Sequence, residues 1–447
     1  MASRLFGTDG VRGVAGTQLG AELALSLGHA ATRLVPASRP KVLLVRDTRE
    51  SGEMLEAAIA AGVSSAGGEV LLGGVLPTPA APLLLRKYGL DLAAVISASH
   101  NPYADNGIKL FGGDGFKLSD EVEEAIEGEL RDGDRGGTSI GRVTELRGAG
   151  EDYLRALHTR FAALDLAGVK VALDCANGAT HAVAPEMFRR LHAEVSTLAD
   201  APDGRNINDG CGSTHIDALR ELMSAGRHDI GFAFDGDGDR VLAVDRDGAV
   251  VDGDELLALA ALHQLARDRL PGGGVAVTVM TNYGFHTAMR DAEIEVATTK
   301  VGDRYVLEEL RARGWTLGGE QSGHIIELGF NTSGDGLAAA LLTLEALAGA
   351  DLAERQAMRR LPQSLLNVAL PAERRTLGPE LAGSLAVERE VQLVDEELAG
   401  RGRVLVRPSG TEPLVRVMVE APTEREANDL CGRLAAVIEG EIARSHG

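Results

Sequence analysis

The sequence predicts an α/β fold, with three related mixed α/β domains and a smaller C-terminal α+β domain around a central cleft. Three observations lead to this prediction. The chain has 447 residues, enough for several domains with cores of their own. Apolar, strand-like runs alternate with helical stretches in three successive sets, and each set ends by running into a polar loop. The last quarter of the chain does not follow this alternation.

The three sets share one plan. In the first set, strands and helices alternate over residues 41–46, 53–63, 69–72, 78–88 and 92–96. In the second set, a helix through 185–191 stands among strands at 169–174, 194–198 and 230–234. In the third set, strands at 275–280 and 294–298 alternate with helices at 284–292 and 303–313. The helix at 53–63 illustrates the signal, because Leu55, Ile59 and Val63 recur at helical spacing.

The last quarter predicts a separate small domain. Residues 387–394, 403–408 and 414–420 are strand-like, and 423–439 has the pattern of an amphipathic helix. Composition places linkers at residues 131–150, 271–274 and 362–374. We therefore expect four domains, at residues 1–148, 149–252, 253–365 and 366–447, with the active site in the cleft among them.

The first polar loop follows the apolar strand at 92–96 and reads Ser-Ala-Ser-His-Asn-Pro over residues 97–102. Small polar residues and a proline end the strand there. Open α/β sheets bind ligands at the carboxyl ends of their strands, so the hydroxyl of Ser99 is a candidate nucleophile. His100 is adjacent to it, and Lys109 lies further along the loop. The alternative is that the serines of this loop only cap the next element.

The second loop places three carboxylates after another apolar strand. Residues 231–240 read Gly-Phe-Ala-Phe-Asp-Gly-Asp-Gly-Asp-Arg, so Asp235, Asp237 and Asp239 stand two apart. Carboxylates this close repel one another unless a cation neutralises them. All-oxygen ligands on a tight loop suit a hard divalent ion, and Mg²⁺ is the natural ion beside phosphate. A calcium EF-hand is excluded, because Arg240 stands where its sixth position requires glycine.

Two further loops carry groups for hydroxyl-rich and anionic ligands. Residues 318–324, Gly-Gly-Glu-Gln-Ser-Gly-His, offer acceptor, hydroxyl and imidazole groups, which suit a polyhydroxylated ligand; a ligand-free helix-entry turn is the alternative. Residues 407–413, Arg-Pro-Ser-Gly-Thr-Glu-Pro, combine a guanidinium with two hydroxyls, a compact cradle for phosphate. Arg416 stands on the apolar strand that follows, and we expect it to contact the anion instead of extending outward.

Residues 97–102, 235–240, 319–324 and 407–413 resemble, in this order, the four signature loops of the α-D-phosphohexomutases, and the resemblance covers essentially the whole chain. It implies that Ser99 is a phosphoserine that gives and takes back a phosphoryl group. It implies that Mg²⁺ is held by a phosphate oxygen on Ser99 and by Asp235, Asp237 and Asp239. The other implied site residues are Arg12, His100, Lys109 and Arg240 around the reacting phosphate, Glu320, Ser322 and His324 at the sugar, and Arg407, Ser409, Gly410, Thr411 and Arg416 at the distal phosphate.

Within this family, the chain most resembles the branch that acts on glucosamine phosphates. Residues 6–13, Phe-Gly-Thr-Asp-Gly-Val-Arg-Gly, residues 299–306, Thr-Lys-Val-Gly-Asp-Arg-Tyr-Val, and Gln321 carry this resemblance. It implies interconversion of glucosamine 6-phosphate and glucosamine 1-phosphate through a phosphoserine enzyme. A sugar 1,6-bisphosphate would be the intermediate and activator, and the product would feed the synthesis of UDP-N-acetylglucosamine and cell-wall precursors.

Three alternatives stay open at this point. A phosphomannomutase or phosphoglucomutase of the same family would use the same loops. An aspartate-nucleophile phosphatase would take the phosphoryl group on Asp235, although that fold needs Thr or Val where Asp239 stands. A catalytically silent phosphosugar sensor would not need Ser99 and the aspartate loop together. No Walker-type phosphate loop is present, which argues against an ATP-dependent kinase.

Composition limits the partners and the location. The formal net charge of −21 argues against nonspecific nucleic-acid binding, so we expect a small phosphosugar as the partner. Three cysteines without metal-site spacing fit a reducing cytoplasm, and the start of the chain lacks the apolar core of a signal peptide. No apolar stretch reaches about 18 residues, so we expect a cytoplasmic protein without a membrane span. Nothing in the sequence identifies a subunit interface, and a homodimer stays an open alternative to a monomer.

Overall fold

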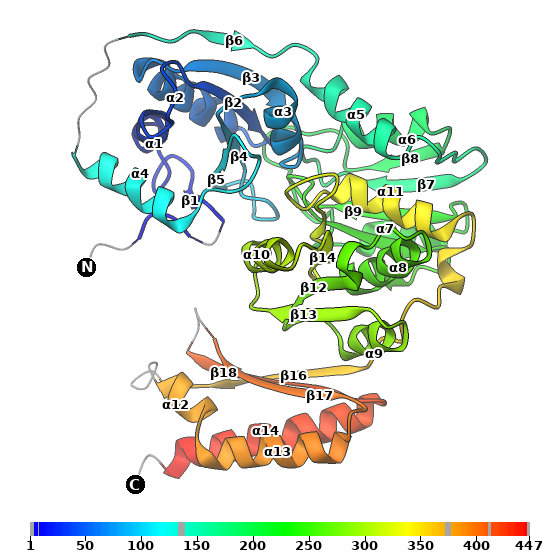
Figure 1. Ribbon diagram of the computed structural model, residues 1–447. Coiled ribbons are helices and arrows are strands. Elements are labelled where there is room, and N and C mark those ends of the chain that lie inside the picture. Colours follow the sequence, from blue (N-terminus) through cyan, green and yellow to red (C-terminus); the bar gives the residue numbers. More distant parts are fainter. Residues whose placement is uncertain (1–3, 8, 133–138, 372–376, 410–412, 445–447) are drawn as a thin grey trace. The chain divides into compact units, whose positions relative to one another are not determined.

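Four β-sheets succeed one another along the chain, each built from strands of one stretch of sequence (Figure 1). The computed structural model describes residues 4–7, 9–132, 139–371, 377–409 and 413–444. In the first three sheets the strands alternate with helices along the chain, and the last is a small antiparallel sheet with helices between and after its strands, which confirms the predicted fold class. The four domain boundaries stay a prediction. None of the helices in these ranges is long and apolar enough to cross a membrane.

The first sheet has six strands in the order β1-β5-β4-β2-β3-β6, with β5 antiparallel to its neighbours β1 and β4 and the other pairs parallel. The strands are β1 Val11–Val14, β2 Lys41–Arg46, β3 Glu69–Val75, β4 Leu92–Ile96, β5 Asp105–Gly112 and β6 Val143–Glu145. The helices are α1 Ala21–Arg33, α2 Ser51–Ser65, α3 Ala80–Tyr88 and α4 Asp120–Asp132. Strand β4 is buried on both faces: Leu92, Ala94 and Ile96 pack in the core with α1 and α2, and α3 packs against β4 as well. This buried strand delivers the polar residues 97–102 at its carboxyl end.

The second sheet has the order β11-β10-β9-β7-β8. Its strands are β7 Lys170–Asp174, β8 Glu194–Leu198, β9 Ile230–Phe234, β10 Val241–Asp245 and β11 Val250–Val251, and its helices are α5 Ala149–Arg160, α6 Val183–Arg190 and α7 Asp217–Ser224. All five residues of β9 are buried, and β10 returns antiparallel to it. Residues 235–240, which we call the aspartate loop, therefore connect the two strands of a hairpin and are held at both ends by the hydrogen bonds between β9 and β10.

The third sheet has the order β13-β12-β14-β15. Its strands are β12 Gly274–Thr278, β13 Glu295–Thr299, β14 Leu317–Gly319 and β15 Ile325–Glu327. Helices α8 Gly253–Ala266, α10 Asp303–Arg313 and α11 Gly336–Leu347 and the short turns η1 Pro271–Gly273 and η2 Leu352–Glu354 accompany it. Strands β14 and β15 are antiparallel neighbours, and the backbone N–H of Glu320 donates to the carbonyl of His324 at 3.0 Å. Residues 320–324 thus form a tight loop at the end of β14.

The chain divides into two compact units. The first comprises Met1–Met280 and Ile294–Arg355, and the second comprises Thr281–Glu293 and Gln356–Gly447. Helix α9, Tyr283–Asp291, belongs to the second unit because its first turn is bound there. The buried carboxylate of Glu420 accepts from the backbone N–H of Tyr283 at 2.7 Å and from the side chain of Asn282 at 3.3 Å.

The second unit contains an antiparallel sheet in the order β16-β18-β17, with α13 and α14 side by side against it (Figure 1). Its strands are β16 Gln363–Ala369, β17 Arg403–Pro408 and β18 Leu414–Glu420, and its other helices are α12 Gly378–Ala382, α13 Leu385–Leu398 and α14 Glu424–Arg444. Two predictions were wrong here. Residues 387–394 lie in α13 and not in a strand, and the predicted linker at 362–374 contains β16 in its described part.

Candidate active site

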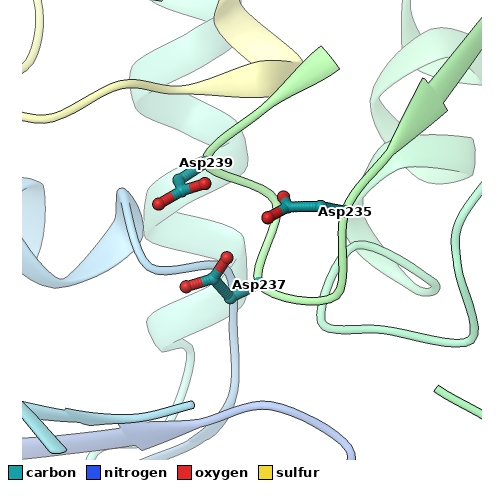
Figure 2. A group of neighbouring side chains, drawn as sticks. All are labelled: Asp235, Asp237 and Asp239. Atoms are coloured by element: carbon teal, nitrogen blue, oxygen red, sulfur yellow. The ribbon is translucent and has the colours of Figure 1, made fainter. Parts of the chain in front are cut away.

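The three aspartates of the second loop stand together in the structure (Figure 2). Asp235 directly follows β9, Asp237 lies in the loop, and Asp239 stands shortly before β10. One carboxylate oxygen from each lies within 4.8 Å of the others, and all three side chains are buried. The loop is pressed against the first polar loop, because a Cβ at Gly236 would come 2.6 Å from the carbonyl oxygen of Ser99. Glycine is required there by this close approach.

The aspartate trio fits a divalent cation. Burial, and after it the neighbouring carboxylates of Asp239 and Asp237, raise the pKa of Asp235 well above its ordinary value. One oxygen of Asp237 and one of Asp239 are buried without a hydrogen-bond partner among the described residues. A hard cation with oxygen ligands would satisfy these oxygens and remove the repulsion between the carboxylates. The donor set and the burial are therefore those of a Mg²⁺ site.

Ser99 faces this trio from the end of β4. Its hydroxyl donates to Asp235 Oδ2 at 2.5 Å and lies 3.2 Å from His100 Nδ1. The side chain is buried, and the backbone has φ +54°, a left-handed conformation that is costly for a residue other than glycine. The Ser99 N–H donates to the hydroxyl of Ser97 at 2.9 Å, and that hydroxyl donates to Asp47 Oδ2 at 2.5 Å. These contacts hold Ser99 in its strained conformation.

Arg49 holds the same loop by binding its backbone carbonyl oxygens, and the sequence analysis missed this residue. Its guanidinium is fully buried, pairs with Asp47 at 2.9 Å, and donates to the carbonyl oxygens of Ser99 at 3.0 Å and Asn101 at 2.8 Å. It also donates to the carbonyl oxygens of Pro102 and Asp105. A signal existed for this residue, because Asp47 and Arg49 follow directly on the buried strand β2, as the predicted loops follow theirs.

Lys109, in the middle of β5, reaches the aspartate trio. Its Nζ donates to Asp237 Oδ2 at 2.8 Å and lies 3.4 Å from Asp239 Oδ2 and 3.1 Å from Asp9 Oδ2. Burial alone would lower the pKa of Lys109, but Asp237, Asp9 and Asp239 hold it well above its ordinary value. Lys109 is therefore a fixed positive charge beside the trio.

Three more basic side chains predicted at the reacting phosphate lie in the same cluster. Arg12 pairs with Asp9 at 2.5 Å, and Arg240 Nε lies 3.8 Å from Asp239 Oδ1. Burial, and after it the charges of Arg240 and Arg12, lower the pKa of His100. The imidazole of His100 is therefore neutral near pH 7.

A cavity of about 1100 Å³ opens beside this cluster. The predicted site residues that line it are Arg12, His100, Asp239, Arg240, Glu320, Ser322 and His324. Glu320 is held in place because its Oε1 accepts from the backbone N–H of Gly302 at 3.1 Å. The structure thus brings the residues predicted at the reacting phosphate, the metal and the sugar to one cavity or directly behind its wall.

Sequence reasoning also missed three charged residues around this cavity. Lys117 Nζ lies 2.6 Å from Asp9 Oδ1 and 2.6 Å from Asp303 Oδ2. Asp303, in the first turn of α10, lies 3.5 Å from His324 Nε2. Asp9 and Asp303 stand within runs that carry the family resemblance, whereas nothing in the local sequence marks Lys117.

The predicted distal-phosphate residues lie in the second unit. Arg407 on β17 is the direct cross-strand neighbour of Arg416 on β18. Burial, and after it the charge of Arg416, lower the pKa of Arg407. Like charges opposite each other in a sheet destabilise it, so an anion bound between the two guanidinium groups would relieve their repulsion. Ser409 directly follows β17, and Gly410 and Thr411 lie outside the described residues.

Comparison with known proteins gives a consistent result along the whole chain. Family models described as phosphoglucomutase/phosphomannomutase α/β/α domains I, II and III match residues 3–136, 151–248 and 252–365. The C-terminal domain model of the same family matches residues 365–437. A phosphoglucosamine mutase of Moorella thermoacetica is 50% identical over 448 residues, which cover 98% of this chain and 99% of that protein.

Solved structures agree with the family models. A phosphoglucomutase/phosphomannomutase family protein of Burkholderia thailandensis superimposes with a TM-score of 0.81 at 25% identity, over 98% of both chains. An N-acetylphosphoglucosamine mutase of Aspergillus fumigatus, solved with GlcNAc-6P and magnesium, shares the fold. Its TM-score is 0.65 at 18% identity, over 97% of this chain and 95% of that one.

Proposed function

This chain belongs to the phosphoglucomutase/phosphomannomutase family and is a mutase enzyme, and from this premise we propose how its own residues interconvert glucosamine 6-phosphate and glucosamine 1-phosphate. Support for the amino sugar comes from the full-length relative of Moorella thermoacetica, which is a phosphoglucosamine mutase. The observation that carries the mechanism is the contact between the Ser99 hydroxyl and the aspartate trio, 2.5 Å from Asp235 Oδ2.

We propose that Ser99 carries the phosphoryl group in the active enzyme. The oxygen of the free hydroxyl of glucosamine 6-phosphate or glucosamine 1-phosphate attacks the phosphorus, the bond between Ser99 Oγ and phosphorus breaks, and a sugar 1,6-bisphosphate results. After the bisphosphate turns end over end, Ser99 Oγ takes back the other phosphoryl group. In the first transfer the sugar hydroxyl loses a proton and the released Ser99 Oγ gains one; in the second transfer Ser99 loses a proton and the released sugar oxygen gains one. Neither a proton nor a phosphoryl group is consumed overall.

The reacting phosphate needs positive charge around it, because transfer depends on placement and charge neutralisation more than on covalent chemistry. We propose that Asp235, Asp237 and Asp239, with a phosphate oxygen on Ser99, would hold Mg²⁺. The bound ion would supply charge neutralisation at the transferring oxygens. Lys109, fixed by its ion pairs, adds a permanent positive charge on the same side.

The other basic residues have related roles. We propose that Arg12 and Arg240 contact the oxygens of the reacting phosphate, since both line the cavity beside the trio. His100 stands within reach of the Ser99 proton, 3.2 Å from Oγ. Because its ring is neutral near pH 7, it can accept that proton when Ser99 attacks.

The remaining residues position the sugar. We propose that Glu320, Ser322 and His324 bind the sugar hydroxyls, for which the cavity offers both acceptors and donors. The phosphate that is not being transferred would bind to the arginines of β17 and β18 and to residues that follow β17 in the sequence. The residues of this group are Arg407, Ser409, Gly410, Thr411 and Arg416.

The test combines a label with a substrate comparison. The purified enzyme is incubated with ³²P-labelled sugar bisphosphate, and the labelled peptide is mapped. We expect the label on Ser99, and we expect Ser99→Ala to abolish isomerisation with an unchanged circular dichroism spectrum. Label on Asp235 would instead identify an aspartate-nucleophile phosphatase.

Turnover of glucosamine, glucose and mannose 6-phosphates is compared with the same preparation. The proposal requires the highest kcat/KM for glucosamine 6-phosphate. A higher value for glucose or mannose 6-phosphate would make the chain a phosphoglucomutase or phosphomannomutase with the same machinery.

A further inference from the structure

Six ionisable side chains form a closed ring at one side of the cavity. Each acidic member contacts two basic members, and each basic member lies between two acidic ones. Going round, the contacts are Asp9–Lys117 at 2.6 Å, Lys117–Asp303 at 2.6 Å, Asp303–His324 at 3.5 Å, His324–Asp239 at 3.6 Å, Asp239–Lys109 at 3.4 Å and Lys109–Asp9 at 3.1 Å. The ring members lie before β1 (Asp9), on β5 (Lys109), between β5 and α4 (Lys117), between β9 and β10 (Asp239), at the start of α10 (Asp303) and between β14 and β15 (His324).

Lys117 differs from the other members of this ring. Asp9, Asp239, Asp303 and His324 line the cavity, and Lys109 contacts the aspartate trio through Asp237. Lys117 is not among the residues that line the cavity, and within the described residues its ammonium group forms ion pairs with Asp9 and Asp303. Lys117 is therefore placed to act on the reaction indirectly, through the two carboxylates that it contacts.

The two carboxylates depend on Lys117 for their placement. Both lie 2.6 Å from one ammonium nitrogen, and both are more than three-quarters shielded from solvent. Without that nitrogen they would repel each other at short range in a poorly solvated place. Asp9 also contacts Lys109 and Arg12, and Asp303 also contacts His324. A shift of either carboxylate would thus displace a residue proposed at the reacting phosphate or at the sugar.

We propose that Lys117 is a positioning residue of the mutase: by holding Asp9 and Asp303 together, it fixes Lys109 against the aspartate trio and His324 beside Asp239. This inference rests on the proposed function. It assigns Lys117 no contact with the substrate. Its contribution is to keep groups that face the transferring phosphoryl group in their working places.

The experiment compares Lys117→Met, Lys117→Gln and Lys117→Arg with wild type, and Lys87→Met serves as the matched control. Lys87 also pairs with an aspartate in the same unit, but it is 41% exposed and lies outside the cavity. We expect kcat of the Met and Gln variants to fall about 10- to 100-fold with KM changed much less, because misplacement by a fraction of an ångström affects the transition state most. Lys117→Arg keeps the charge and should recover most of the rate, and Lys87→Met should match wild type.

A double-variant cycle with Asp303→Asn tests whether Lys117 acts through its partner. If it does, Lys117→Met will cost clearly less in the Asp303→Asn background than in wild type. The inference is overturned if folded Lys117→Met, verified by its thermal unfolding, keeps kcat within about twofold of wild type or if the two substitutions are simply additive. The assay uses whichever phosphosugar wild type turns over fastest, so a different sugar preference would count against the proposed substrate and not against Lys117.

Discussion

Loss of Arg49, the fully buried arginine that binds the loop of residues 97–102, should strongly reduce the stability of the protein. Its guanidinium has one charged partner, Asp47 at 2.9 Å, and the side chains of both residues have no exposure to solvent. Burial raises the pKa of Asp47 even in the presence of Arg49, which shows how little solvation this carboxylate receives. Substitution Arg49→Met would leave that carboxylate without its cation. It would also remove the charged donor to the carbonyl oxygens of Ser99 and Asn101, which would keep their bonds from the Asn208 amide.

The expected loss follows from the burial of the pair. Removing one partner of a buried ion pair costs about 3–5 kcal/mol, because the other charge stays buried and uncompensated. An exposed pair would cost about 0–1 kcal/mol. Arg205 supplies the matched control: it pairs with Glu50 at 2.8 Å, but the two side chains are 67% and 48% exposed. Arg205→Met should therefore change the free energy of unfolding by less than about 1 kcal/mol.

Urea unfolding followed by tryptophan fluorescence measures this loss of stability. The single tryptophan, Trp315, is buried in the core of the first compact unit, which also contains Arg49. In the double variant Asp47→Asn/Arg49→Met neither buried charge remains, so stability should return to within about 1–2 kcal/mol of wild type. Its kcat should stay low, since residues 99–105 still lack the four bonds that the Arg49 guanidinium donates to their carbonyl oxygens. The reasoning is refuted if Arg49→Met loses less than about 1 kcal/mol, or if the double variant is no more stable than the single one.

Three further predictions concern the metal, the distal phosphate and pH. Asp237→Asn should raise the Mg²⁺ concentration for half-maximal activity at least about tenfold in a titration after chelation, and an unchanged midpoint would remove Asp237 from the metal site. Arg407→Ala should raise KM about 10- to 100-fold with a smaller effect on kcat in steady-state assays, because a hydrogen bond to a charged group is lost; an unchanged KM would count against the arginine pair. Burial raises the pKa of Asp335 to about 6, above about 3.9 in the unfolded chain, so its proton stabilises the fold below about pH 4 and this contribution falls as the pH rises to 6. Between about pH 4 and pH 6, the free energy of unfolding of Asp335→Asn, measured in urea, should rise by up to about 3 kcal/mol relative to that of wild type. A difference that stays constant over this range would contradict the raised pKa of Asp335.

The four polar loops could be predicted because each is encoded locally. Residues 97–102 and 235–240 both follow strands that are buried along their full length, β4 and β9. A continuous apolar run followed abruptly by polar residues is a signal within one short window of sequence. The hairpin of β10 and β11 is encoded just as locally, since an Asp-Gly turn joins the two strands.

The misread helix shows the limit of short windows. Residues 387–394 contain valines near both ends, which suggested a strand. In α13, Val387, Val394 and Leu398 are buried, and their spacings of seven and four residues place them on one face of the helix. Ser384 caps the first turn by accepting from the backbone N–H of Val387. Helical period and cap together would have predicted this helix, whereas residues 387–394 alone do not include the cap.

The partners of two buried charged residues, Arg49 and Glu420, could not be predicted from the sequence for a different reason. Arg49 binds carbonyl oxygens about fifty residues away, and Glu420 binds the backbone N–H of Tyr283, 137 positions away. Both act on backbone groups that the local fold leaves without a partner: the carbonyls of a turn with a left-handed serine, and the first N–H groups of a helix. Local sequence shows that such groups will exist but not which distant charge will satisfy them. For this reason the position of Ser99 could be predicted from its strand, while its conformation, on which the proposed phosphoryl transfer depends, is determined by Arg49 and Asp47.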